Sequence, residues 1–430
     1  MIGWLFLSFF LLLFLGVPIA ACLGLSSLIA LVATGSNVNL IVAAQTMFKG
    51  VSSYPLMAIP FFILAGNLMG DGGLSRKLVG FINLFFSRFR GGLASVTITS
   101  SMFFAAISGS CPATTAAIGG VMVPEMEKAG YDKEFSAATA AAAGTVGQVI
   151  PPSIPMVTYC VLAEISISTL FLAGFGPGLL MGILMMAYSY YYAVKHKIPV
   201  VKQEISVRIV VKAFIDSLWA LIMPVIILGG IYSGLFTPTE AGAMASLYGL
   251  ICGAFIYRSL RWKDVPDILC KTAIASAVIM LIMGAVSTFG YVLTRGHIPA
   301  IIAENLLSLT SNKVILLLLF NIVVLFAGMF LSSSAAVALL TPILLPVMTS
   351  VGISPYVVGI VFIVNMGIGM ITPPVGNCLY VACNISKIKF EPLVRACIPY
   401  IIMESIALLL ITYIEPISMG LIWLTGAKLI

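Results

Sequence analysis

The sequence predicts an all-α polytopic membrane protein, on the strength of its composition and of the length of its apolar runs. Of the 430 residues, 61% are hydrophobic and only 9% are charged, whereas about a quarter of the residues of a soluble globular domain carry a charge. A membrane-spanning helix needs about 20 mostly apolar residues. The chain therefore has room for on the order of a dozen spans with short connections, and for no soluble domain between them.

Apolar runs separated by charges or by Pro and Gly clusters are the expected membrane segments. The first run has no cationic start, because Lys49 is the first charge in the chain, and we interpret it as a retained membrane segment rather than a cleavable signal. Two runs are about 33 residues long, too long for one untilted span, and each is expected to double back as a re-entrant hairpin. The runs are 2–33, 55–69, 92–124, 135–162, 170–194, 213–235, 241–257, 272–293, 314–346, 356–382 and 396–414, the two long ones being 92–124 and 314–346.

The distribution of Lys and Arg predicts the orientation of these segments. Cytoplasmic loops are enriched in basic residues, so the densest basic run is assigned to the cytoplasm: Lys195, Lys197, Lys202, Arg208 and Lys212. If both long segments return to the side from which they entered, 18 basic residues lie inside and four lie outside, at Lys49, Arg295, Lys313 and Lys428. A single crossing by either long segment would remove this asymmetry, so the charges favour hairpins.

The two long segments belong to an internal repeat. When Pro124 is aligned with Pro346, Gly147 matches Gly369 and Pro151-Pro152 matches Pro373-Pro374 without a gap. The charged loop lies at opposite ends of the two copies. After the hairpin, the loop 125–134 of the first copy is charged and its counterpart 347–355 is not. After the broken helix, the loop 385–391 of the second copy carries two lysines and its counterpart 163–168 carries none. This exchange is expected if the second copy is inserted upside down. Inverted repeats with discontinuous helices are typical of secondary transporters; chance recurrence in a Gly- and Pro-rich chain is the alternative.

The repeat divides the chain into five expected regions. They are N-terminal scaffold helices and an arm (1–91), a first hairpin with a broken helix (92–165), connecting and scaffold helices (166–312), a second hairpin with a broken helix (313–386), and a C-terminal helix and tail (387–430).

The Pro-Pro pairs and the hydroxyl residues near them are the candidate binding elements. Proline removes a backbone donor and disturbs the preceding turn, and carbonyls freed at membrane depth need a partner in the protein or in a watery cavity. Neutral oxygens of carbonyls and hydroxyls suit Na⁺, while half-helix N-termini favour a carboxylate. The alternative is that the hydroxyls only cap helices or allow close packing. The candidate hydroxyls are Ser108, Ser110, Thr145, Ser332, Ser333 and Thr372.

Other chemistry finds little support. Glu404 lies inside an apolar run; it could relay protons, but helix–helix hydrogen bonding or an interfacial position is the favoured interpretation. No basic residue lies within the two broken-helix regions, so a fixed cation for a substrate carboxylate is not evident. The chain has no Walker A, HExxH or GxSxG sequence, so we expect no enzyme. The net charge of +7 reflects the membrane topology and predicts no nucleic-acid partner.

Over nearly its whole length, the sequence resembles the large membrane subunit of tripartite ATP-independent periplasmic (TRAP) transporters. The segments that carry the resemblance are 15–20, 60–66, 108–116, 144–153, 174–178 and 370–377. The resemblance implies an elevator-type transporter in the bacterial inner membrane, driven by a Na⁺ gradient and needing no other cofactor. It also implies a small four-helix membrane subunit and a periplasmic substrate-binding protein as partners. The implied solutes are organic acids such as C4-dicarboxylates or sialic acid.

The resemblance also assigns roles by motif. Cation coordination is implied at Ser108, Ser110, Gly144, Thr145, Gly147, Ser332, Gly367, Gly369 and Thr372, and substrate contact at Ser332, Ser333, Asn365, Pro374, Gly376 and Asn377. Two alternatives remain open at this point. One is a stand-alone ion-coupled carboxylate permease that needs no binding protein, and the other is a channel whose hairpins form a filter.

Overall fold

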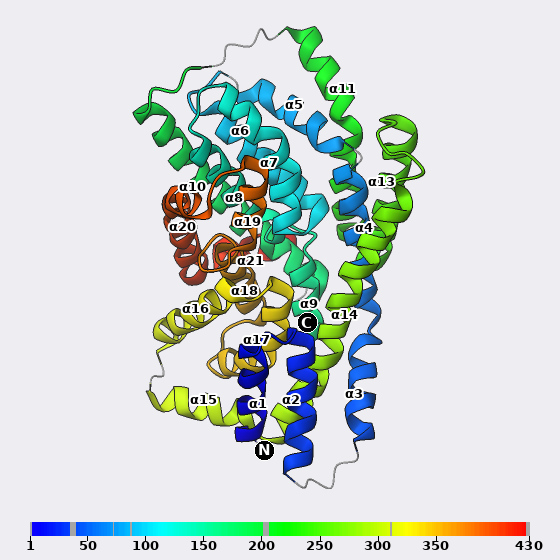
Figure 1. Cartoon of the computed structure of the whole chain (residues 1–430), viewed down its shortest axis with the longest axis vertical. Helices are drawn as coiled ribbons and strands as arrows, with labels where there is room; N and C mark the ends of the chain where they lie inside the picture. The colour runs from blue at the N-terminus through cyan, green and yellow to red at the C-terminus, as the bar shows by residue number, and fades with distance from the viewer. Residues whose placement is uncertain are drawn as a thin grey trace.

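A computed structural model of the chain describes residues 2–34, 40–71, 73–86, 88–200, 206–309 and 312–426. Within these ranges the chain forms helices and no β-strand (Figure 1). Seven of the described helices are long and apolar enough to cross a membrane, or eight if the bent pair Ile41–Val51 and Tyr54–Gly70, at 58°, is one span. The expected multi-pass helical architecture is therefore confirmed.

The N-terminal region contains more helices than the apolar runs indicated. The run 2–33, for which the sequence leaves the number of crossings open, is divided into α1 and α2, because Gly16 adopts a left-handed φ of +77° and Pro18 directly precedes the second helix. Neither α3 nor α5 was expected; each is an amphipathic or charged helix without a long apolar run. The bounds are α1 Ile2–Phe14, α2 Ile19–Ala33, α3 Ile41–Val51, η1 Tyr54–Met57, α4 Ala58–Asp71 and α5 Leu74–Phe86.

The two copies of the repeat fold into the same order of elements. The first contains α6 Gly92–Ser108, α7 Cys111–Lys128, α8 Lys133–Thr145, η2 Val146–Gln148 and α9 Ile154–Ala163. The second contains α16 Lys313–Phe330, α17 Ser333–Ser350, α18 Pro355–Gly369 and α19 Asn377–Ser386. In the register that aligns Pro124 with Pro346, α7 and α17 begin and end at matching positions. Each long segment is a pair of packed helices with a break of a few residues between them.

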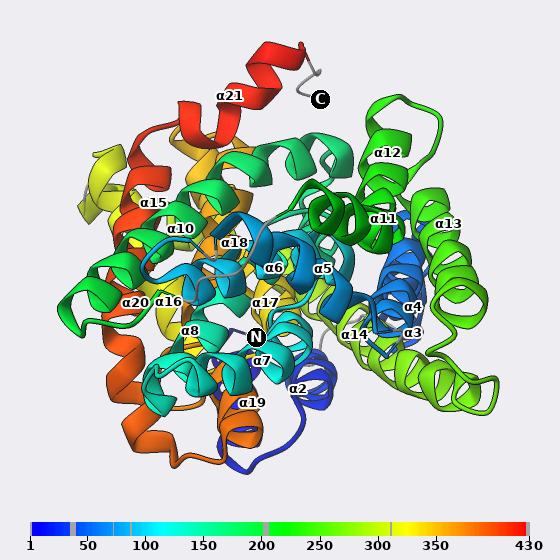
Figure 2. The same ribbon diagram turned by 90° about the horizontal axis from the view of Figure 1, so that it is seen from above.

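The remaining helices surround the repeats. Figure 2 shows α3, α4, α11, α13 and α14 gathered on one side, and α10, α16, α18 and α20 on the other. In the first group α14 packs on α3 and α4, and α13 packs on α4; in the second, α20 packs on α8 and α10. The bounds are α10 Ile167–Lys195, α11 Val207–Pro224, η3 Val225–Gly229, α12 Gly230–Tyr232, α13 Pro238–Ile251, η4 Cys252–Ile256, α14 Val265–Arg295, α15 Ile298–Leu309, α20 Phe390–Tyr413 and α21 Pro416–Thr425.

Figure 1 shows α5 and α11, which carry segments expected on the cytoplasmic side, at the top of the molecule. Lys77 of α5 lies 3.5 Å from Asp216 of α11, and Tyr192 near the end of α10 donates a hydrogen bond to Asp132, in the loop before α8. Lys202 and Lys428, which belong to the charge argument, lie outside the described residues.

Candidate functional site

The first helix pair reverses at Gly109 and Ser110. Gly109 closes α6 with a φ of +59°, and a Cβ at this position would lie 2.8 Å from the carbonyl oxygen of Pro152. Only glycine allows both the left-handed conformation and this close approach. Ser108 Oγ lies 2.7 Å from Thr114 Oγ1, which donates to the carbonyl of Ser110 at 2.9 Å. The tip of this helix pair, residues 108–110, is therefore held by its own hydrogen bonds and packs against the Pro-Pro pair of the first broken helix.

The second helix pair reverses without glycine. Leu331 and Ser332 are extended, with ψ near +150°, and the amide of Ala336 donates to the carbonyl of Ser332. Ser333 Oγ is buried and has no hydrogen-bond partner in the described part of the chain. This tip therefore presents hydroxyl groups that its own backbone does not use.

Each broken helix ends at a Pro-Pro pair joined by a cis peptide bond. In the first, α8 passes through the short turn η2, and Ser153 caps α9 by accepting a hydrogen bond from the amide of Met156 at 3.3 Å. In the second, Gly376 has a φ of +60° and directly precedes α19, and the amide of Cys378 donates to the carbonyl of Met370 at 3.0 Å. Proline at these positions explains why neither helix continues.

The two breaks contact each other. Gln148 Nε2 donates to the carbonyl of Ile363 at 3.1 Å, so a side chain from the first break holds the backbone of α18. A Cβ on Gly367 would lie 3.3 Å from the carbonyl oxygen of Thr145. The folded chain therefore brings together segments that belong to different copies of the repeat and lie far apart in sequence.

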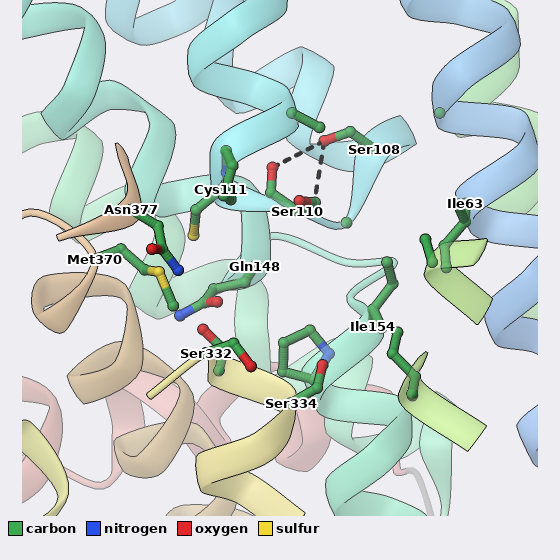
Figure 3. A pocket seen from close by; sticks show the side chains of 18 of the residues that line it. Ile63, Ser108, Ser110, Cys111, Gln148, Ile154, Ser332, Ser334, Met370 and Asn377 are labelled. Atoms are coloured by element: carbon green, nitrogen blue, oxygen red, sulfur yellow. Dashed lines mark hydrogen bonds between the residues drawn. The ribbon is translucent and has the colours of Figure 1, made fainter. Parts of the chain in front are cut away.

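Both tips and both breaks line one cavity of about 350 Å³. In Figure 3 the side chains of Gln148, Ser332 and Asn377 point into the same space, below the tip that carries Ser108 and Ser110. The opposite wall comes from α4 and α14. The lining residues are Ile63, Gly66, Asn67, Ser108–Ala113, Gln148, Ile154, Pro155, Lys271, Ala275, Ile279, Ser332–Ser334, Met370 and Asn377.

Four helix N-termini converge on this cavity. The lining residues include the first residues of α7, α9, α17 and α19. A helix N-terminus carries a partial charge of about +0.5 and presents unpaired backbone N–H groups. The arrangement therefore favours an anion, although most of the side chains around it are neutral.

The structure places the sequence-predicted residues in two groups. Five of them line the cavity: Ser108, Ser110, Ser332, Ser333 and Asn377. The others lie behind the wall or in the breaks, and three of these have side chains engaged elsewhere. Thr145 Oγ1 donates to Glu404 Oε1, Thr372 Oγ1 donates to the carbonyl of Ile368, and Asn365 Nδ2 donates to Asn321 Oδ1.

The predicted glycines mark close backbone approaches. A Cβ on Gly144 would lie 1.8 Å from Thr115 Oγ1, one on Gly147 would lie 2.6 Å from the carbonyl oxygen of Ser110, and one on Gly369 would lie 2.5 Å from the carbonyl carbon of Gly328. A Cβ on Gly376 would meet Leu379 at 2.7 Å. Pro374 is exposed and is not among the cavity-lining residues. These positions set how closely tips and breaks pack rather than supplying side chains.

Sequence reasoning missed several polar lining residues. Gln148 and Asn67 lie in or beside segments that carried the family resemblance, so their motifs were a usable signal. Lys271 lines the cavity from α14 and is 2.7 Å from Asp267. The sequence argument looked for a cation only within the broken-helix regions; a scaffold helix brings one to the cavity instead.

Glu404 is fully buried within α20. Its Oε1 accepts the hydrogen bond from Thr145 at 2.8 Å, which is the helix–helix contact favoured from the sequence. Its Oε2 has no hydrogen-bond partner in the described ranges. One turn earlier on α20, the hydroxyl of Tyr400 lies 2.8 Å from both Thr139 and Ser189. This helix thus holds α8 and α10 through buried polar groups.

A multi-pass helical protein with a cavity lined by helix breaks and a few hydroxyl and amide side chains has the features of a membrane transport protein. Residues 6–417 match the family model described as "Tripartite ATP-independent periplasmic transporter, DctM component". The chain belongs to this family, which confirms the resemblance noted in the sequence.

Relatives with assigned names are transporter permeases. The chain is 45% identical to the isethionate TRAP transporter permease protein DctMQ of Oleidesulfovibrio alaskensis over 96% of its own length, but it covers only 65% of that protein. It is 40% identical to the C4-dicarboxylate TRAP transporter large permease DctM of Pseudomonas aeruginosa, with 88% of each chain covered. It is 37% identical to the sialic acid TRAP transporter large permease SiaM of Vibrio cholerae, with 95% of this chain and 94% of that one covered.

Among solved structures, the fold is similar to the Alcanivorax borkumensis YdaH transporter. The TM-score is 0.62 at 17% sequence identity, covering 86% of this chain and 88% of the other. At this identity the likeness concerns the fold alone.

Proposed function

We propose that the chain is the permease subunit of a Na⁺-coupled secondary transporter that imports an organic acid. The observation that carries the proposal is the convergence of four helix N-termini, two from each copy of the repeat, on one cavity. A carboxylate or sulfonate placed there would accept hydrogen bonds from backbone N–H groups and face positive helix ends. Lys271, which is paired with Asp267 at 2.7 Å, places an ammonium group in the same cavity.

The proposed Na⁺ ligands are neutral oxygens at the tip–break contacts. In the first copy, Gly147 lies against the carbonyl of Ser110 and against Thr114 Oγ1, so backbone and hydroxyl oxygens gather within a small volume. The matching elements of the second copy are Ser332 and Gly369. Carbonyl and hydroxyl oxygens are the donors that hard cations prefer, and half-helix C-termini direct such carbonyls toward the breaks.

The proposed mechanism is elevator-type alternating access, with the two copies related by an inverted pseudo-two-fold axis. Three features support it: the matching bounds of α7 and α17, the exchange of loop charge between copies, and reciprocal packing of α7 on α19 and α17 on α9. In this arrangement the helix pairs α6–α7 and α16–α17 act as re-entrant hairpins. The moving body would be residues 92–165 and 313–386, and α3, α4, α11, α13 and α14 would form the scaffold.

The proposed partners are a small four-helix membrane subunit and a periplasmic binding protein, in the bacterial inner membrane. The relative DctMQ is longer than this chain, which covers 65% of it; a fused small subunit would account for the additional length. The solute class proposed is a small organic carboxylate or sulfonate, in keeping with the isethionate, C4-dicarboxylate and sialic acid named for the relatives.

The test is uptake by the reconstituted complex. We expect radiolabelled organic acid to accumulate only with an inward Na⁺ gradient, and a membrane potential to increase uptake if net charge moves, by about 2.3 kcal/mol per charge per 100 mV. Uptake that persists when choline replaces Na⁺ and follows a proton gradient would refute Na⁺ coupling. Uptake without the binding protein would favour a stand-alone permease, and single-channel currents would favour a channel.

A further inference from the structure

A second cavity, of about 680 Å³, adjoins the first. Gly66, Asn67 and Ala113 line both cavities, so the two spaces meet between α4 and the start of α7. From there the second cavity follows one flank of α7, past Ala116 and Gly120, toward Tyr257 and Ser259. It is the larger and more polar of the two spaces.

The wall of this second cavity carries two cations, both at the start of α5. The ammonium group of Lys77 forms an ion pair with the carboxylate of Asp216 at 3.5 Å. Arg76 is exposed and forms no ion pair with any acidic residue that the structure describes. Among the lining side chains that the structure describes, none is Asp or Glu. The described part of the wall therefore has a net positive charge, with Arg76 as its uncompensated cation.

The position of this charge matters because α5 packs beside α11, whose Arg208 and Lys212 belong to the densest basic run, at the end of the molecule shown at the top of Figure 1. A channel of small residues on α7 leaves the space open: a Cβ added at Gly120 would meet nothing within 4 Å. A low-dielectric wall with one sign of charge raises the local concentration of oppositely charged solutes. An anion that moves between the inner cavity and the basic end of the protein would therefore be attracted to the wall of the second cavity.

We infer that the second cavity is an anion-binding vestibule, in which an organic carboxylate or sulfonate pairs transiently with Arg76 on its way between the inner cavity and the basic end of the protein. This inference rests on the proposed function for the identity of the solute. It assigns a role to Arg76 that no family motif in the sequence indicated, because Arg76 reaches the route only through the packing of α5 beside α7.

The electrostatic part can be measured without any transport. A single cysteine is introduced by Ala116→Cys, at a position that is exposed and lines the vestibule, in a background in which the exposed Cys270 and half-buried Cys383 are replaced by serine. The full-length chain, with any subunit that copurifies, is placed in nanodiscs. It is labelled with sulfonatoethyl methanethiosulfonate, an anion, or with its trimethylammonioethyl analogue, a cation. Mass spectrometry of this chain gives both rates.

We expect the anionic reagent to be favoured at position 116, and Arg76→Gln to lower the anion-to-cation rate ratio on the order of tenfold. Lys77→Gln also removes one positive charge from this wall and leaves Asp216 unpaired, so it should lower the ratio as well. The matched control is Arg395→Gln, an exposed arginine paired with Glu391 and outside both cavities. A ratio that Arg76→Gln leaves unchanged, or that Arg395→Gln lowers equally, overturns the inference.

A second measurement links the vestibule to the solute. Isethionate, succinate and sialic acid are each tested for protection of the introduced thiol from the anionic reagent; we expect protection by the transported acid, weakened by Arg76→Gln. Absence of protection by an acid that the protein imports would refute passage through the vestibule. If uptake is driven by Na⁺ but Arg76→Gln does not change the labelling ratio, the vestibule is refuted and the proposed function is not. If Arg76→Gln changes the labelling ratio but uptake is not driven by Na⁺, the proposed function is refuted and the anion-attracting cavity is not.

Discussion

Gly147→Ala tests the contact between the first tip and the first break. An alanine Cβ would lie 2.6 Å from both the carbonyl oxygen of Ser110 and Thr114 Oγ1, and 2.9 Å from the carbonyl carbon of Ser110. Two of these three atoms are backbone, so the tip itself has to move by several tenths of an ångström. Overpacking of this kind costs about 1–3 kcal/mol.

The displaced tip carries the proposed cation ligands Ser108 and Ser110. If the cost falls on the arrangement that binds Na⁺, the apparent Na⁺ affinity should weaken by about 5- to 150-fold, since 1.4 kcal/mol corresponds to a factor of ten. The assay is the Na⁺ concentration giving half-maximal uptake in proteoliposomes, with the Na⁺-induced shift in thermal unfolding as a second measurement.

The matched control is Gly24→Ala, within α2. A Cβ there meets nothing within 4 Å, and replacing a helical glycine by alanine stabilises by about 0.5–1 kcal/mol. Gly24→Ala should therefore keep the Na⁺ dependence of the native chain and unfold at the same or a slightly higher temperature. If Gly147→Ala keeps both the Na⁺ midpoint and the unfolding temperature, the tip–break contact does not form as described.

Three further outcomes follow from the site. Ser108→Ala and Ser332→Ala should each raise the Na⁺ concentration for half-maximal uptake, and an unchanged value would exclude these hydroxyls as ligands. Gln148→Leu removes the hydrogen bond from Nε2 to the carbonyl of Ile363, an oxygen that keeps its helical partner in α18, so thermal unfolding should show a loss of about 0.5–1.5 kcal/mol; a fully stable variant would show that this bond does not hold the two breaks together. Lys271→Gln should raise the KM for the organic acid and leave the Na⁺ midpoint in place, whereas an effect on Na⁺ alone would contradict its assignment to the anion.

The class of molecule and the local breaks in its helices could be predicted from residue type alone. Apolar run length fixes which segments can enter a membrane, because the bilayer does not solvate unpaired backbone. The Pro-Pro pairs and the internal repeat predicted where the helices end, and the structure has matching bounds for α7 and α17. These are local effects, so they can be recognised without knowing what packs against them. The division of 2–33 at Gly16 and Pro18 is equally local, although the apolar stretches on both sides left the number of crossings open in the sequence.

Which residues share the cavity could be learned only from the folded chain. Gln148 holds the backbone of α18, and Lys271 enters the cavity from a helix that carries none of the repeat motifs. Thr145 Oγ1 donates a hydrogen bond to Glu404 of α20, and Asn365 Nδ2 donates one to Asn321 of α16. Contacts between distant parts of the sequence depend on how whole helices pack, and packing is set by the summed shapes of many side chains. A motif therefore locates a break in the chain, while the partners around that break come from the fold.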